Sequence, residues 1–263
     1  MPLYKEHLIN PYLKVLIAAE SGNGKTSLLA TLLKANYRVA VIDVDNGLDI
    51  LSSYCPPDLY NNLFFATYDK ADPLTITKVK GLIKNWVTPQ ENLGPPAKWG
   101  LNSVIVIDTL TSLGDSSLKS AQRSPQEGRH EYQVAQDSLS EILDILLSPT
   151  YETNVLINTH LSLIEDATGL KKLYPTAVGK ALSRVMAREF NNVWRIDVKP
   201  GNDTRVIRTQ SDHLMALKSS APSILAKEEV FDLGDIFKRV LKHNQNLAAA
   251  ISARISTPLK SSA

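Results

Sequence analysis

Residues 19–26 (AESGNGKT) place glycines, a lysine and a hydroxyl residue at the spacing of a phosphate-binding loop. Glycines let the backbone turn so that successive N–H groups can face an anion. Lys25 can reach the outer phosphates of a nucleoside triphosphate, and Thr26 can offer its hydroxyl to Mg²⁺. Ala19 stands where a first glycine is usual, and a small residue suits that position. The residues predicted to bind the triphosphate are Glu20, Ser21, Gly22, Asn23, Gly24, Lys25, Thr26 and Ser27.

The segments on either side of this loop have the character that such a site needs. Residues 13–18 are mostly apolar, as in a buried strand, and residues 27–33 contain no Gly or Pro and are rich in helix formers. A helix that starts after the loop adds the positive end of its dipole at the phosphates. Strand, loop and helix together predict a nucleoside-triphosphate site, because a chance glycine turn would lack that context.

A carboxylate ends a second apolar segment, residues 104–108. Asp108 should therefore lie at the same sheet edge as the loop, where a carboxylate can hold Mg²⁺ through its water shell. The alternative is an ordinary cap, made by Asp108 or Thr109, for whatever follows the strand. Thr26 and Asp108 are the predicted metal-binding residues.

Polar residues also follow two other predicted strands. Asp43 and Asp45 come at the end of residues 38–43, and a carboxylate near the γ-phosphate could orient or activate water. Residues 154–158 are a further apolar strand that leads into His160. A polar side chain there could sense the γ-phosphate, although a lone histidine is as often structural.

Length and composition bound the class of protein. With 263 residues, of which 43% are hydrophobic, the chain can form one large domain or one domain with an appendage. Because the net charge is only +2, any nucleic-acid-binding surface would have to be a local basic patch. Cys55 cannot form an internal disulfide, and no signal peptide or membrane-length apolar run is present. We expect a soluble cytoplasmic protein with no membrane partner.

The remaining pattern predicts an α/β fold. Strands are expected at residues 63–68 and as a hairpin of 193–198 with 204–209, around a turn at 200–203. Helices are expected over 73–87 (with Asp72 as cap), 132–147, 179–189 and 227–242, and irregular stretches over 88–100, 114–128 and 161–178. This order predicts a mostly parallel twisted sheet flanked by helices, with a late antiparallel hairpin. The predicted domain organisation is a core over 1–243 and a flexible C-terminal tail over 244–263.

Taken together, these motifs resemble the core of the RecA family of recombinase ATPases. Residues 40–49 (AVIDVDNGLD) are similar to the family's strand followed by IDxExALD, and Asp45 stands at the position of its catalytic glutamate. Residues 104–113 resemble the second nucleotide motif, with Asp108 as the metal-side aspartate. The shorter Asp45 side chain puts the rate of hydrolysis and the position of the attacking water in question.

Residues 157–160 (INTH) resemble the family's sensor segment, where Thr159 or His160 takes the place of a glutamine. Residues 216–222 (ALKSSAP) resemble the segment that inserts a lysine into a neighbour's ATP site, and Lys218 is the candidate. The resemblance therefore implies a filament or a ring. The catalytic residues that it implies are Lys25, Asp45, His160 and Lys218.

The two longer irregular stretches fall where this family keeps its DNA-binding loops. The resemblance places DNA contacts near them, and the residues concerned are Arg129, His130, Lys171, Lys172, Gly179, Lys180 and Arg184. The alternative is a charged, solvated surface with no ligand. Residues 175–182 look like the family's Gly-rich loop entering a helix, whose N–H groups can hold DNA phosphates.

The function that the resemblance implies is a DNA-dependent ATPase for single-strand recombination or annealing. ATP and Mg²⁺ are the implied cofactors, and single-stranded DNA, further copies of the chain and a single-strand-binding protein are the implied partners. The compact form resembles phage-type members, which would place it in the host cytoplasm. The alternatives are a nucleotide-gated switch or assembly factor with a protein partner, a helicase-like DNA motor, and a small-molecule kinase, for which an arginine-rich lid is missing.

Overall fold

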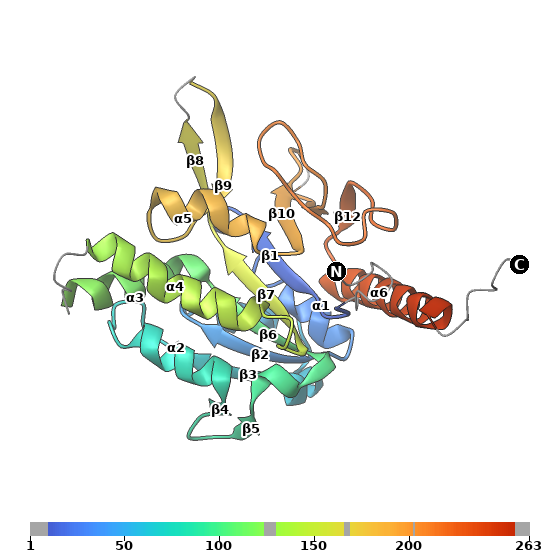
Figure 1. The fold of residues 1–263 in the computed structure, drawn as a ribbon, viewed down its shortest axis with the longest axis horizontal. Helices are drawn as coiled ribbons and strands as arrows, with labels where there is room; N and C mark the ends of the chain where they lie inside the picture. The colour runs from blue at the N-terminus through green and yellow to red at the C-terminus, as the bar shows by residue number, and fades with distance from the viewer. Residues whose placement is uncertain (1–9, 124–129, 166–168, 202, 256–263) are drawn as a thin grey trace, which may run out of the picture.

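An eight-stranded sheet organises the chain, in the order β12-β11-β10-β1-β7-β6-β2-β3 (Figure 1). The computed structural model describes residues 10–123, 130–165, 169–201 and 203–255. The six strands from β10 to β3 run parallel, and β11 and β12 are antiparallel. The strands are β1 (Lys14–Ala18), β2 (Arg38–Asp43), β3 (Leu63–Thr67), β6 (Gly100–Asp108), β7 (Thr153–Thr159), β10 (Asn192–Val198), β11 (Arg205–Arg208) and β12 (Glu228–Val230). The predicted mostly parallel sheet with a late antiparallel hairpin is confirmed.

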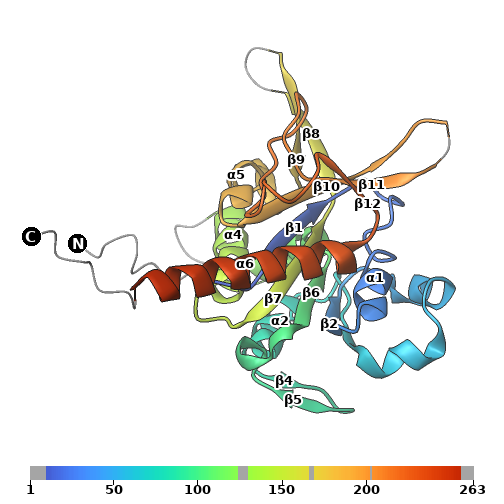
Figure 2. The same ribbon diagram turned by 90° about the vertical axis from the view of Figure 1, so that its right-hand side faces the viewer.

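Helices cover both faces of this sheet (Figures 1 and 2). One face packs against α1 (Leu29–Lys34) and α6 (Leu233–Ile255), whose buried leucines, Ile236 and Phe237 join the apolar residues of β1, β2 and β10. The helices on the other face are α2 (Thr75–Lys84), α3 (Leu110–Arg123), α4 (Glu131–Leu147) and α5 (Gly179–Val185). Short 3₁₀ segments are η2 (Leu48–Ser53), η3 (Pro57–Asn62), η4 (Pro96–Lys98) and η5 (Met186–Arg188). Because the central strands are buried on both faces, their sequences are largely continuous apolar runs.

The start of α6 is anchored on α1, the helix that follows the glycine loop. The backbone N–H groups of Leu233 and Gly234 donate to Thr31 Oγ1 at 2.9 and 3.3 Å. A Cβ on Gly234 would overlap the Thr31 carbonyl oxygen, so only glycine lets the two helices approach this closely. The C-terminal helix thereby supports the element that positions the loop.

The prediction of an irregular stretch over 114–128 is wrong as far as Arg123, because α3 is helical there. The buried side of α3 begins with Leu110 and Leu113 and continues, within the stretch predicted to be irregular, with the small residues Gly114, Ser116, Ser117 and Ala121. Ser117 Oγ, for example, donates to the Ala135 carbonyl oxygen at 2.8 Å. From Gly114 to Arg123 only Leu118 and Ala121 are apolar, which is too few apolar residues for a helix prediction to rest on. Arg129 lies outside the described residues.

The second predicted irregular stretch, 161–178, is largely an antiparallel hairpin. It consists of β8 (Leu161–Glu165) and β9 (Lys171–Pro175), which pair from Leu161–Pro175 to Glu165–Lys171. The hairpin projects away from the main sheet in both views (Figures 1 and 2). Such a two-stranded ribbon needs no buried apolar run, and Leu163 is 59% exposed. The pattern of a buried strand is therefore absent from its sequence.

Two further boundaries differ from the prediction. Helix α2 ends at Lys84, and β4 (Trp86–Val87) then pairs with β5 (Asn92–Gly94) inside the segment expected to be helix and loop. Helix α6 begins at Leu233 and continues to Ile255, into the segment for which a flexible tail is predicted. No helix in the described part of the chain combines the length and apolar character that crossing a bilayer requires.

Candidate nucleotide site

The glycine loop leaves the carboxyl end of β1 and lines a cavity of about 280 Å³. Gly22 and Gly24 have φ angles of 82° and 96°, which L-residues with a Cβ rarely adopt. Leu28 N–H donates to the Gly24 carbonyl at 2.9 Å and closes the first turn before α1. The cavity is lined by loop residues 21, 22 and 24–27, together with residues at the ends of β6 and β11, in the segments that follow β2, β6 and β7, and in or next to η2. This is the strand–loop–helix geometry that the sequence predicts.

Lys25 is buried inside the loop, with 7% of the residue exposed. Its Nζ donates to the carbonyl oxygens of Ala19 (3.2 Å) and Glu20 (3.0 Å) and lies 3.2 Å from His160 Nδ1. Burial lowers the pKa of Lys25, and the nearby carboxylates of Asp108 and Asp45 oppose that shift. The ammonium group is thus fixed at the cavity by backbone acceptors and one imidazole.

Thr26 and Asp108 meet directly. Thr26 Oγ1 donates to Asp108 Oδ2 at 2.6 Å, and Asn158 Nδ2 donates to Asp108 Oδ1 at 3.1 Å. Burial raises the pKa of Asp108, while its two hydrogen bonds lower it. A hydroxyl and a carboxylate oxygen side by side, next to a phosphate loop, fit Mg²⁺, which takes few protein ligands beside phosphates and water. Among the residues described, no three His, Cys, Asp or Glu side chains form a cluster that could hold a metal ion.

Asp45 also lines the cavity and is held by three side chains. Ser112 Oγ donates to Oδ1, Thr109 Oγ1 donates to Oδ2 at 3.1 Å, and His160 Nε2 lies 3.6 Å from Oδ2. Burial acts to raise the pKa of Asp45, but these partners outweigh it and hold the pKa at about 2. The side chain is therefore an oriented carboxylate at neutral pH.

Asp43 has a different task from Asp45. It is buried, and its Oδ1 accepts the backbone N–H groups of Asp45 (3.1 Å) and Gly47 (3.4 Å). Asp43 therefore shapes the turn that carries Asp45, and burial raises its pKa. Of the two carboxylates considered for orienting water, only Asp45 lines the cavity.

His160 joins the two halves of the site, because one ring nitrogen lies near Lys25 and the other near Asp45. Thr159, the alternative at this strand end, is buried and donates its Oγ1 to the Thr176 carbonyl at 2.7 Å. Of the two, only His160 lines the cavity, whereas Thr159 ties the strand end to the segment after β9.

Comparison with known sequences bears on the same region. Residues 12–220 match the model of a family described as an AAA domain. The chain belongs to this AAA-domain family. The match spans the glycine loop, Asp45, Asp108, His160 and Lys218. Among solved structures, the AAA-domain chain is similar to the crystal structure of the RadB recombinase, with 15% identity, 80% of this chain and 87% of that chain covered, and a TM-score of 0.42. No curated protein matches it.

Several residues that line the cavity of the AAA-domain chain or bind its carboxylates are not among the predicted site residues. Thr109 and Ser112 follow the Asp108 strand and bind Asp45, and the string TLTS at 109–112 could have indicated them. Tyr54 and Arg205 also line the cavity. Arg205 belongs to β11, and only the pairing of β10 with β1 brings that hairpin to the loop.

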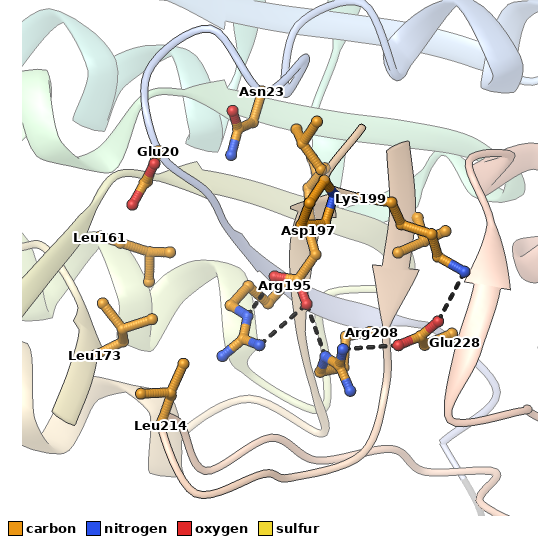
Figure 3. Close-up of a pocket in the computed structure, with 14 residues that line it drawn as sticks. Glu20, Asn23, Leu161, Leu173, Arg195, Asp197, Lys199, Arg208, Leu214 and Glu228 are labelled. Atoms are coloured by element: carbon orange, nitrogen blue, oxygen red, sulfur yellow. Dashed lines mark hydrogen bonds and ion pairs between the residues drawn. The ribbon is translucent and has the colours of Figure 1, made fainter. Parts of the chain in front are cut away.

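A second cavity of about 500 Å³ adjoins the first half of the loop (Figure 3). The side chains of Glu20 and Asn23 face this cavity and not the nucleotide cavity, so the loop backbone is their contribution to the predicted site. Arg195 and Asp197 line this cavity and form an ion pair (2.6 Å), and Arg195 also binds Asp212 (2.5 Å). Leu161, Leu173 and Leu214 form the apolar wall.

The predicted DNA-contact residues occupy the hairpin and the elements beside it. Lys171 and Lys172 are exposed on β9, and Lys180 and Arg184 lie on α5. Lys172 and Arg184 line one cavity of about 250 Å³ together with Tyr174 and His213.

Two residues near these elements have local structural roles. Gly179 has a φ of 72°, and a Cβ there would lie 2.6 Å from Gln136 Nε2. His130 is the N-cap of α4, where its Nδ1 accepts the Tyr132 N–H at 3.3 Å.

Lys218 lies on the surface, away from its own chain's nucleotide cavity. Its backbone pairs with Val193, and its Nζ donates to the Arg188 carbonyl oxygen at 2.7 Å. Lys218 does not line the loop cavity.

Proposed function

We propose that this chain binds ATP with Mg²⁺, hydrolyses it, and uses the bound triphosphate to control its grip on single-stranded DNA in recombination or annealing. The observation that carries the proposal is the convergence of Lys25, Thr26, Asp45, Asp108 and His160 on one cavity behind a phosphate loop. These are the parts that phosphoryl transfer to water requires.

Each residue has a role that follows from its contacts. The loop N–H groups and Lys25 would hold the phosphates, and Thr26 and Asp108 would hold Mg²⁺. When bound, Mg²⁺ neutralises charge on the phosphate oxygens. Asp45 stays ionised and is fixed by Ser112 and Thr109, so it can accept a hydrogen bond from water and orient it. His160 lies between this carboxylate and Lys25, where it can register changes at the γ-phosphate.

A hydrogen-bond path supports coupling between this cavity and the projecting hairpin. His160 immediately precedes β8, and its carbonyl oxygen accepts the Thr176 N–H at 2.8 Å. Thr176 Oγ1 in turn bonds Ser162 Oγ at 2.6 Å. A shift of His160 toward or away from the phosphates would therefore be transmitted to both strands of the hairpin.

A basic and aromatic cavity supports DNA as the ligand of the hairpin region. Lys172 and Arg184 line the same cavity, and Tyr174 supplies an aromatic ring beside them. Cations hold phosphates, and aromatic rings stack on bases, which is the combination that single-strand binding uses. The overall charge of +2 is small, so this local patch would carry the affinity.

The first prediction tests this surface. The double substitution Lys172→Gln with Arg184→Gln should weaken binding of a labelled oligonucleotide about tenfold at moderate salt and lower DNA-stimulated ATPase activity. Its slope of log affinity against log salt should flatten by about 0.7 for each lost phosphate contact. Fluorescence anisotropy across a salt titration, with ATPase assays with and without DNA, measures both effects.

A matched control keeps the same change in net charge. Lys78 and Lys98 form surface ion pairs with Asp72 and Glu152. Their double glutamine variant should bind DNA like the wild type. If DNA does not stimulate the wild-type ATPase even at low salt, the proposal gives way to a nucleotide-gated switch with a protein partner.

The second prediction tests whether the active unit is a homo-oligomer. Lys218 should complete the triphosphate site of a neighbouring copy. Copies with Lys218→Ala and copies with Lys25→Ala should each have little ATPase activity alone. Mixed together, they should regain part of it, because a mixed pair contains one intact loop facing one intact lysine.

Steady-state assays over a range of mixing ratios, with particle size from light scattering, provide the measurement. A mixture no more active than its components would remove Lys218 from the triphosphate site. Membership of a compact phage-type group, host cytoplasm as location, and a single-strand-binding protein as partner remain predictions from the sequence.

A further inference from the structure

Arg205 is a cation on the wall of the loop cavity, and its surroundings differ from those of its neighbours. On the same hairpin, Arg195 and Arg208 bind carboxylates, as the dashed lines in Figure 3 show for Asp197. Arg205 forms no ion pair with any carboxylate in the described part of the chain, and its buried Nε has no hydrogen-bond partner there. Arg205 is half-buried as a whole, but its Nε is buried, and a buried donor without an acceptor is costly, so this position favours an anion.

Two contacts fix Arg205 against the loop. Its guanidinium group lies 5.9 Å from the centroid of the Phe231 ring. A Cβ placed on Gly24 would lie 3.0 Å from Phe231 Cζ and 3.2 Å from Arg205 Cδ. Gly24 therefore serves the turn and also lets this pair of side chains reach the loop backbone.

The position of Arg205 indicates which phosphates it would meet. Lys25 Nζ, Asp45 and His160 form one group in the cavity, which is the γ-phosphate end of the proposed site. Arg205 instead abuts Gly24, and a Cβ at that glycine would also come within 2.9 Å of Ser27 Oγ. In phosphate loops the backbone beside this segment cradles the α- and β-phosphates.

We propose that Arg205 binds the α- and β-phosphates of the nucleotide from within the same subunit, held in place by Phe231. The planar guanidinium group suits bidentate contact with phosphate oxygens. This inference rests on the proposed nucleotide site and adds a ligand that comes from the C-terminal hairpin. Because both phosphates occur in ADP and ATP, Arg205 should contribute equally to the affinity for the two nucleotides.

The test is titration of the full chain with Mg²⁺–ADP and with Mg²⁺–ATP by calorimetry. Arg205→Gln should weaken both about 10- to 100-fold with an unchanged ratio of the two affinities. Arg205→Lys, which keeps the charge but not the fork, should fall between Arg205→Gln and the wild type. In ATPase assays, KM should rise by a larger factor than kcat falls.

The matched control is Arg38→Gln. Arg38 also has a buried Nε without a partner among the described residues, and it lies over the rings of Phe64 (4.8 Å) and Trp99 (5.2 Å), but at the start of β2. The Arg38→Gln variant should bind ADP and ATP with the affinities of the wild type.

The outcomes separate this inference from the proposed function. If the wild type binds nucleotide, and Arg205→Gln binds both ADP and ATP as tightly as the wild type does, the inference alone is wrong. A loss confined to ATP would also overturn it, because it would put Arg205 at the γ-phosphate. If the wild type binds neither nucleotide, the proposed function fails and this inference fails with it.

Discussion

Replacing Lys25 with alanine is expected to lower ATP turnover by about 10²-fold or more, since a preorganised group that stabilises transition-state charge is worth that much in other enzymes. Lys25 Nζ is fixed at the cavity by two loop carbonyls and His160. No water molecule or flexible side chain could reproduce a buried ammonium at that point. The affinity for ATP should fall as well, because the same group holds the ground-state phosphates.

The measurement is steady-state ATPase activity together with ATP-dependent binding of single-stranded DNA. Lys34→Ala is the matched control, because Lys34 is an exposed lysine in the last turn of α1. It should change the free energy of unfolding by less than about 1 kcal/mol through the helix dipole and leave turnover intact. A Lys25→Ala protein that keeps both turnover and ATP-dependent DNA binding would contradict the mechanism.

The nucleotide motifs could be predicted from sequence because their signals are local. A buried strand, a glycine loop and a helix are adjacent in the chain at residues 13–33, and Asp108 directly ends its own strand. Parallel strands bring their carboxyl ends to one edge, so the convergence of these residues needs only the fold class. In the structure, Asp43 and Asp108 are register partners on adjacent strands, as that argument requires.

The elements between these motifs could not be predicted in the same way. Helix α3 turns serines and Gly114 toward the core, and a Cβ on Gly114 would lie 3.2 Å from the Val178 backbone nitrogen. Such close packing selects small residues, so the part of α3 after Leu113 has few of the apolar residues that identify a helix. The β8–β9 hairpin is hard to predict for a different reason. It projects from the body and buries few apolar side chains, so its sequence lacks the apolar pattern of a buried strand.

Arg205 illustrates a third kind of limit. Nothing near residue 205 resembles a nucleotide motif. Its place in the cavity follows from the sheet order, in which β10 pairs with β1, β11 pairs with β10, and Phe231 follows β12. Contacts made across a sheet by distant segments depend on topology, which a single sequence indicates only at the level of fold class.

Asp45→Asn should separate binding of ATP from its hydrolysis. The amide keeps the shape of the carboxyl group but cannot serve as a charged acceptor for water, so kcat should fall by about 10²- to 10⁴-fold. The affinity for ATP should change little, because Lys25, Gly22 and Gly24 are untouched. Asp45→Glu, which restores a carboxylate with one more methylene, should retain more activity than the asparagine variant.

The same substitution has a consequence for stability in acid. The pKa of Asp45 falls from its ordinary value of 3.8 to about 2 in the folded chain. Because the folded value is the lower one, ionised Asp45 stabilises the fold above about pH 4, and this stabilisation is lost as the pH falls toward about 2. A pKa shift of this size corresponds to a contribution of about 2 kcal/mol to the free energy of unfolding.

Denaturant unfolding of the wild type and Asp45→Asn at about pH 7 and about pH 3 measures this contribution, with exposed Asp49→Asn as the matched control. The wild type should lose more free energy of unfolding than Asp45→Asn over that interval, and Asp49→Asn should follow the wild type. An Asp45→Asn protein with unchanged turnover would assign the orientation of water to another carboxylate. Equal acid sensitivity would mean that Ser112, Thr109 and His160 do not hold Asp45 as an anion, and the hydrolytic role would lose its physical basis.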